Sequence, residues 1–208
     1  MISDNREAYG QQGDDTHLDP SIAMRFMIQQ MLNGMQTVAL VKVIRVSSPG
    51  GIAPVGKVDV KPLVNQMTGN RQSVPHEEIF AVPYFRLQGG KNTVILDPEE
   101  GDIGICVFCS RDSASVIATA NFANPNTNRR FDWADGLYVG GFLNAAPVQY
   151  VQFAQDGIAL VSPQKVTLQA PSIELHGAVR ANSTLVAQGE VSSAVDVKAA
   201  SVSLKNHV

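Results

Sequence analysis

Residues 156–179, DGIALVSPQKVTLQAPSIELHGAV, repeat a short pattern in which two apolar side chains are separated by one residue. The apolar pairs are Ile158 and Leu160, Val166 and Leu168, and Ile173 and Leu175. Such alternation predicts very short β-strands, each of which turns two or three side chains to one face. A unit this small cannot bury its apolar face alone, so it has to stack on neighbouring units.

Two arrangements could stack these units. A single-chain β-helix usually needs longer coils, because one chain then supplies every side of the core. Three chains around one axis need only one short strand from each chain in each layer. We therefore expect an intertwined homotrimer, a triangular β-prism whose closed sheets hide their strand edges. The side chains expected on the trimer axis are Ile158, Leu160, Val166, Leu168, Ile173, Leu175, Val195, Val197, Val202 and Leu204.

The segment before the repeat also has the two-residue period of β-strands. The strands expected there are residues 37–46, 57–64, 79–87, 92–96 and 102–109. Five short strands separated by turn residues predict a small barrel of the oligonucleotide/oligosaccharide-binding (OB) type. Residues 113–122 are expected to form a short helix, and residues 123–142 an ordered loop.

A helix is expected near the N-terminus. Asp19 followed by Pro20 is typical of a helix start, and Asn33 followed by Gly34 is typical of a helix end. Apolar residues cover more than one face between these limits, so the helix packs either on its own domain or against another subunit. Several of them are methionines, which adapt well to partner surfaces.

The expected fold is therefore mainly β and has four segments. Residues 1–36 are an N-terminal arm and helix, and residues 37–122 are an OB-fold-like five-stranded barrel. Residues 123–147 are a linking loop, and residues 148–208 form the C-terminal intertwined trimeric β-helix or β-prism.

Composition excludes several classes of protein. The net charge of −3 gives no overall positive field that would favour nucleic acid or an anionic membrane. The sequence has no run of 18 apolar residues and no apolar segment typical of a signal peptide. It has only two cysteines, too few for a disulfide framework. We expect a soluble chain made in a reducing compartment.

Motifs with a possible chemical role are weak. Cys106 and Cys109 have the C-x-x-C spacing, but they fall in an expected strand and are interpreted as buried, inert thiols. No catalytic set or acid/base pair is evident, so we expect no enzyme. An OB barrel can bind single-stranded nucleic acid or a glycan, and Tyr84, Phe85 and Arg86 with Arg71 are the candidates for that alternative. The acidic chain argues against it.

A small barrel followed by a prism of short repeated strands resembles the architecture of the central spike proteins of contractile phage tails. The resemblance covers roughly residues 37–208. The residues that resemble the family's "GD-x-G … F … RD" pattern are Gly101, Asp102, Gly104, Phe108, Arg111 and Asp112. The residues that resemble its link from barrel to prism are Asn128, Arg129, Arg130, Asp135 and Gly136. A further alternative is that the chain forms a different trimeric structure, the base of a fibre such as a receptor-binding tail fibre.

The resemblance implies a structural, non-enzymatic homotrimer at the tip of the tail tube, driven through the host outer membrane when the sheath contracts. Its partners would be baseplate hub and tail tube proteins, with no nucleic acid and no cofactor. Its location would be the tail baseplate of a virion, after synthesis in the host cytoplasm. The side chains expected to dock to the hub are Ile22, Phe26, Met27 and Met31.

The prism of this family often ends in a His-x-His motif, with which three chains bind an apical iron ion. The present sequence ends in SLKNHV, with His207 and no second histidine. We therefore expect no metal ligand unless the native chain continues as His-x-His. Otherwise a separate tip protein would complete the needle.

Overall fold

A computed structural model of the chain describes residues 19–47, 51–52, 56–68, 72–199 and 202–203. The chain divides into two compact units, Met1–Ala146 and Pro147–Val208. The elements of the first unit are α1 (Pro20–Asn33), β1 (Val38–Val46), β2 (Lys57–Pro62), β3 (Gln66–Met67), β4 (Ser73–Val74), β5 (Ile79–Pro83), β6 (Gln88–Gly89), β7 (Asn92–Thr93), β8 (Ile103–Phe108), α2 (Ala114–Thr119), η2 (Trp133–Asp135) and β9 (Gly136–Gly141). The elements of the second unit are β10 (Tyr150–Ala154), β11 (Gly157–Val161), β12 (Lys198–Ala199) and β13 (Val202–Ser203).

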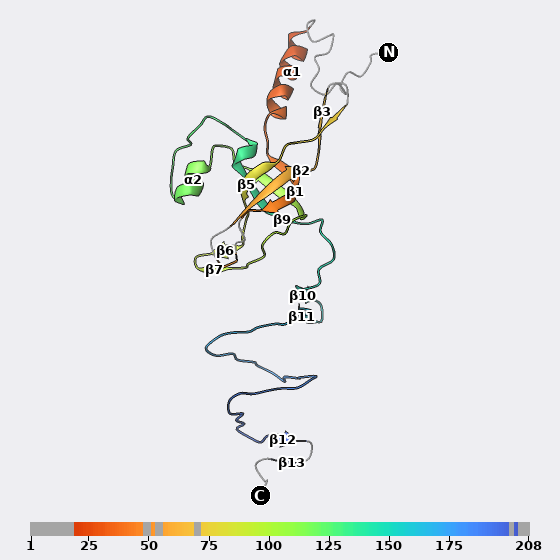
Figure 1. The fold of residues 1–208 in the computed structure, drawn as a ribbon, viewed down its shortest axis with the longest axis vertical. Helices are drawn as coiled ribbons and strands as arrows, with labels where there is room; N and C mark the ends of the chain where they lie inside the picture. The colour runs from red at the N-terminus through yellow and green to blue at the C-terminus, as the bar shows by residue number, and fades with distance from the viewer. Residues whose placement is uncertain (1–18, 48–50, 53–55, 69–71, 200–201, 204–208) are drawn as a thin grey trace. The chain divides into compact units, whose positions relative to one another are not determined.

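The first unit is built on a five-stranded antiparallel sheet with the order β5-β2-β1-β8-β9 (Figure 1). The sheet curls into a half-barrel, and a parallel bridge between Tyr84 and Tyr138 joins the segment after β5 to β9. The Phe85 amide donates a hydrogen bond to the Tyr138 carbonyl at 2.7 Å across this junction. The mainly β prediction is thus confirmed.

One face of the sheet forms the core because its side chains alternate. In β1, Val41 and Val43 are fully buried, whereas Lys42 between them is exposed. The buried hydrophobic residues are Val41, Val43, Val58, Val60, Val82, Tyr84, Cys106, Phe108 and Tyr138. Trp133 packs on this cluster, with its ring edge-on to Phe108 at 5.0 Å between centroids.

The prediction of a loop over residues 123–142 is wrong for residues 136–141, which form β9. β9 takes the outer place beside β8 that completes the five strands. The strand expected at 92–96 is also wrong in extent, since only Asn92–Thr93 pairs, in a two-stranded hairpin with β6. Likewise, the strand expected at 79–87 ends at Pro83.

Gly104 allows β8 and β9 to approach closely. A Cβ atom at this position would collide with the Gly140 carbonyl and would lie 2.5 Å from the Tyr138 hydroxyl. The close packing of β8 and β9 therefore requires the second glycine of the G-D-x-G segment, Gly104. Burial raises the pKa of the Tyr138 hydroxyl to about 12, with smaller contributions from Asp102 and Cys106.

Helix α1 begins and ends where the sequence predicted. The Asp19 carboxylate accepts a hydrogen bond from the Ser21 amide at 2.8 Å, and Pro20 is the first helical residue. Gly34 caps the other end through its backbone amide. The short helix expected within 113–122 is confirmed as α2.

In the second unit, β10 and β11 form an antiparallel hairpin and β12 pairs with β13. Residues 162–197 contain no strand. The structure therefore does not show the short strands expected around Val166, Leu168, Ile173 and Leu175.

Candidate assembly interface

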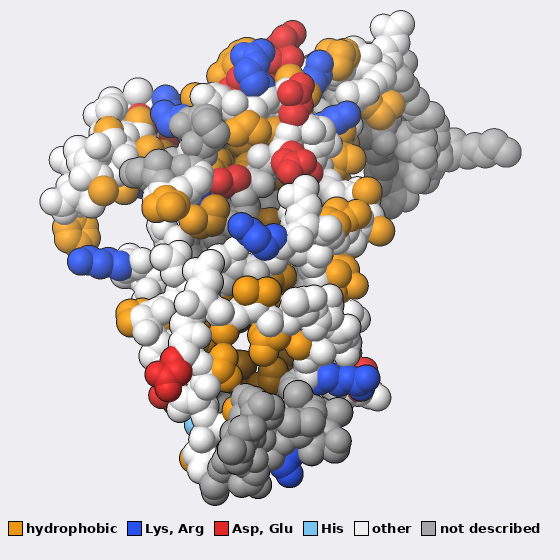
Figure 2. Space-filling model, turned by 60° about the horizontal axis from the view of Figure 1, so that its bottom comes forward, with side chains coloured by type: hydrophobic (Ala, Val, Ile, Leu, Met, Phe, Trp, Pro, Cys, Tyr) orange, Lys and Arg blue, Asp and Glu red, His pale blue; other side chains and the backbone are white. Residues whose placement is uncertain are grey.

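The β10–β11 hairpin carries an apolar face that stays exposed in the described part of the chain. Its register places Val151 opposite Leu160 and Phe153 opposite Ile158, so that these four side chains share one face. Between 56% and 78% of each remains exposed. Figure 2 shows hydrophobic side chains open to view at many places on the surface turned toward the reader. A contiguous apolar surface of this kind marks a place for a partner.

The rest of the repeat is equally uncovered. None of residues 147–198 is buried. Ser162, Asp196 and Val197 are partly buried, and all the others are exposed. The predicted axis residues that are exposed are Ile158, Leu160, Val166, Leu168, Ile173, Leu175 and Val195. The single chain does not bring them together into a core. Leu204 and the side chain of Val202 are outside the part of the chain that the structure describes.

Val151 and Phe153 belong to this surface but were missed as axis candidates. The alternation of Val151, Gln152 and Phe153 was the available signal. Their pairing with Leu160 and Ile158 becomes clear only from the hairpin register. The register shows a shared face for the first four of the following positions, and we call the whole set of exposed apolar positions the repeat face: Val151, Phe153, Ile158, Leu160, Val166, Leu168, Ile173 and Leu175.

Helix α1 carries a second uncovered apolar surface. None of its residues is buried. The large exposed side chains are Met24, Met27, Ile28, Met31 and Leu32, which we call the α1 stripe. Their spacing of three, four, seven and eight residues from Met24 places them on one side of the helix.

The four side chains predicted to dock to a hub do not share one face of α1. Met27 and Met31 belong to the α1 stripe, whereas Ile22 and Phe26 lie on the opposite side. Ile22 and Phe26 are also half-buried, while Met27 and Met31 are exposed. Sequence reasoning missed the stripe because the apolar residues of this segment surround much of the helix.

Three of the motif residues that carried the family resemblance, Asp112, Arg129 and Asp135, meet in a partly buried ion cluster. Arg129 donates to Asp112 at 2.8 Å and to Asp135 at 2.7 Å, and both carboxylate side chains are 1% exposed. The Ser113 amide also donates to Asp135, and the Thr127 hydroxyl to Asp112. Arg129 therefore pairs with two carboxylates at once, Asp112 and Asp135. The cluster holds the α2 segment and the start of β9 on the sheet.

Hydrogen bonding keeps both carboxylates of this cluster ionised. The pKa of Asp112 is lowered chiefly by the Ala114 amide and the Thr127 hydroxyl. Burial opposes ionisation of Asp135, but hydrogen bonds from Arg129 and Ser113 outweigh it and lower the pKa of that carboxyl. Because every partner is engaged within the cluster, its role is structural.

The residues considered for a nucleic-acid or glycan groove do not form an open platform. Tyr84 and Arg86 are buried, and both bond to the Asp97 carboxylate. Phe85 is half exposed on the other side of the segment. Arg71 lies outside the described residues. Stacking of bases between Tyr84 and Arg86 is thus not available in this structure.

The cysteines and histidines provide no metal centre among the residues that can be placed. Cys106 is buried as expected, and burial raises its pKa to about 12. The prediction is wrong for Cys109, which follows the end of β8 and is exposed. Over the described ranges, His, Cys, Asp and Glu form no group of three that could hold a metal ion. His207 lies beyond those ranges.

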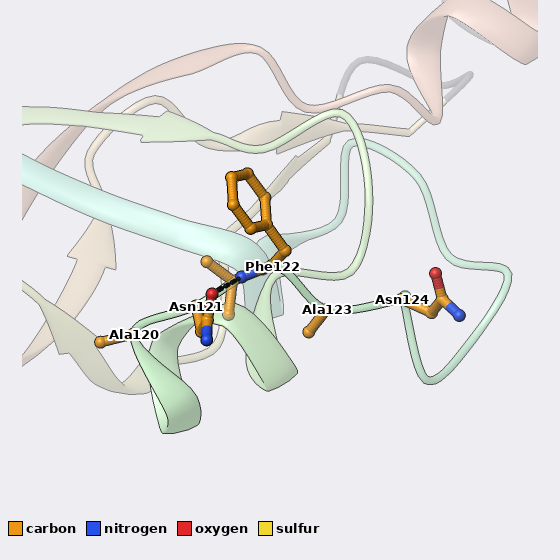
Figure 3. A pocket seen from close by; sticks show the side chains of 6 residues that line it. Ala120, Asn121, Phe122, Ala123 and Asn124 are labelled. Atoms are coloured by element: carbon orange, nitrogen blue, oxygen red, sulfur yellow. Dashed lines mark hydrogen bonds between the residues drawn. The ribbon is translucent and has the colours of Figure 1, made fainter.

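An open depression next to α2 is lined by Val116 and by residues 120–124. Figure 3 shows the ring of Phe122 pointing away from the side chain of Ala123. Apart from the amides of Asn121 and Asn124, its lining side chains are apolar, and no charged group faces it. No chemistry follows from this arrangement.

In the part of the chain that is described, no helix has the length and apolar character to span a membrane.

A scan against protein-family models and a search of curated proteins both found no match to this chain. The function therefore has to be argued from the surfaces and clusters described above.

Proposed function

We propose that this chain is a structural protein of a contractile phage tail, the homotrimeric central spike at the tip of the tail tube. One observation carries the proposal. Residues 147–198 present alternating apolar side chains, yet none of these residues is buried within one chain. Two further copies wound around a common axis would cover this surface without any other protein.

Three copies suit this surface better than a single-chain helix. Each coil of the repeat turns only two large apolar side chains inward, which fills one wall of a prism but not three. Removing such a side chain from water stabilises the assembly by roughly 1–2 kcal/mol, given that about half to two-thirds of each is exposed in one chain. The repeat supplies many such positions, and the closed prism leaves no strand edge.

The first unit suits the role of a base for this rod. The curled sheet and its junction at Tyr138 are consistent with an OB-type barrel. The ion cluster of Arg129 with Asp112 and Asp135 ties down the connection that resembles the family's link. Under load, these charge-assisted bonds would resist separation of α2 and β9 from the barrel.

The mechanism in this proposal is mechanical. The barrel would sit on the hub and tube, and the interwound rod would transmit the thrust of sheath contraction to the outer membrane. A shared apolar axis would make unfolding of one chain depend on separation of all three. The chain would need no cofactor and would perform no chemical step.

Immunogold electron microscopy tests this function directly. An antibody against the purified chain should label the tip of contractile tails in particles from the source of the gene. An antibody against the major tail sheath protein is the control for particle access. Labelling at the tip supports the proposal. Labelling along lateral fibres would favour the tail-fibre alternative, and a chain found only free in the cell would contradict both.

A further inference from the structure

The α1 stripe, made of Met24, Met27, Ile28, Met31 and Leu32, has no role in the barrel or in the repeat. Between 49% and 71% of each side chain is exposed. A helix of 14 residues is too short to be stable alone in water, so most of its stability has to come from packing of an apolar face. This stripe is the face that such packing would use.

The spacing of the stripe is that of a helix which packs along its length on other helices. With Met24 and Met31 at equivalent positions of successive heptads, Met27 and Ile28 fill the positions between them. The exposed residues outside the stripe between Met24 and Asn33 are polar or charged, namely Arg25, Gln29, Gln30 and Asn33. The apolar and polar sides are thus arranged as in one member of a helix bundle.

The charges on α1 favour another copy of the same helix as the occupant. Arg25 is its single charged residue, and it lies seven residues before Leu32, at the outer edge of the α1 stripe. The positions that directly flank the seam of Met24, Met27 and Met31 are Ile28 and Gln30, and both are neutral. When identical helices meet, every charge near the seam faces its own sign, so a neutral seam is the arrangement that permits self-association.

We propose that three copies of α1 pack through the α1 stripe into a parallel three-helix bundle. The inference rests on the proposed homotrimer, because three copies joined through the repeat face hold their helices at a high effective concentration. It also changes the hub-docking prediction. Met27 and Met31 would face sister helices, which leaves the side of Ile22 and Phe26 for contacts with other proteins.

Disulfide trapping in the full-length chain tests the bundle. The background variant is Cys109→Ser, which removes the exposed thiol and leaves the buried Cys106. Met31→Cys is then compared with Gln29→Cys, which has an exposed position on the other side of the same helix. Mild oxidation should convert most Met31→Cys chains into covalent dimers on a denaturing, non-reducing gel, and few Gln29→Cys chains. Met27→Cys is the second stripe position in case the first variant folds poorly.

The solution mass of the same samples before oxidation separates the two proposals. A trimeric mass with dimers only from the stripe positions supports the bundle. A trimeric mass with no dimers, or with equal yields from Gln29→Cys and both stripe variants, overturns the bundle and leaves the spike intact. A monomeric mass overturns the trimer itself.

Discussion

Replacing Leu168 by aspartate is the sharpest single perturbation of the repeat face. In one chain 66% of Leu168 is exposed, so the trimer would remove roughly two-thirds of this side chain from water. Full burial of a leucine is worth about 1.5–3 kcal/mol, which gives about 1–2 kcal/mol per chain and about 3–6 kcal/mol per trimer. Three carboxylates near a dry axis add several kcal/mol for each ion. We expect Leu168→Asp to abolish the trimer.

Thr167→Asp is the matched control for this substitution. Thr167 is the exposed neighbour of Leu168, and alternation would turn it outward in a prism strand. The control should remain trimeric by light scattering after size exclusion. Leu168→Ala should also remain trimeric but unfold at a lower temperature.

Fluorescence of the only tryptophan, Trp133, shows whether the first unit stays folded in these variants, because its ring packs against Phe108 and His76. The emission of Leu168→Asp should match that of the wild type. If Leu168→Asp and Thr167→Asp both kept the trimer, or both lost it, the assignment of the inward face would be refuted.

Three further predictions concern the first unit. The pKa of Asp135 is lowered in the folded state, so its stabilising effect is present above about pH 4 and is lost as the pH falls through the folded pKa. The unfolding temperature, followed by tryptophan fluorescence, should therefore decrease when the pH is lowered under about 4. The variant Asp135→Asn should be less stable than the wild type at pH 7, and its unfolding temperature should depend less on acid. Equal acid sensitivity of the two proteins would contradict the role of the cluster. Gly104→Ala should destabilise the sheet by about 1–3 kcal/mol or more, because the new Cβ meets the Gly140 carbonyl, and an unchanged denaturant midpoint would refute that contact. A thiol reagent should label Cys109 in the native protein and Cys106 only after unfolding, and rapid native labelling of both would show that the core is open.

Local signals predicted the elements that depend on neighbouring residues. Asp19 and Pro20 determine the start of α1 through a cap and a fixed backbone angle, which the sequence displays directly. The alternation in residues 38–46 and 57–62 likewise identified β1 and β2, because one face of each has to be buried.

Elements that depend on distant partners were harder to predict. β9 has the sequence GLYVGG, whose glycines give weak alternation, and it forms because β8 offers an edge with the small Gly104. In contrast, residues 94–96 are strongly apolar, but they are exposed and belong to no strand. Hydrophobicity alone therefore predicted a longer strand than the one that forms. Period and pairing partner are both needed for a strand.

The candidate interface could be predicted in kind but not in full. Of the alternating pairs predicted from Ile158 to Leu175, the structure places Ile158 and Leu160 on a shared face. Val151 and Phe153 joined it only through the register of the hairpin. The ion cluster was not predicted, because one of its carboxylates, Asp112, is 17 residues from Arg129 in the sequence.

The solution mass of the purified full-length chain tests the central claim most directly. Light scattering after size exclusion, with and without mild SDS, would measure it against the chain mass of 22.3 kDa. The interwound spike predicts three times this mass, retained in the detergent. A monomer at all concentrations would contradict the trimer and, with it, the proposed spike.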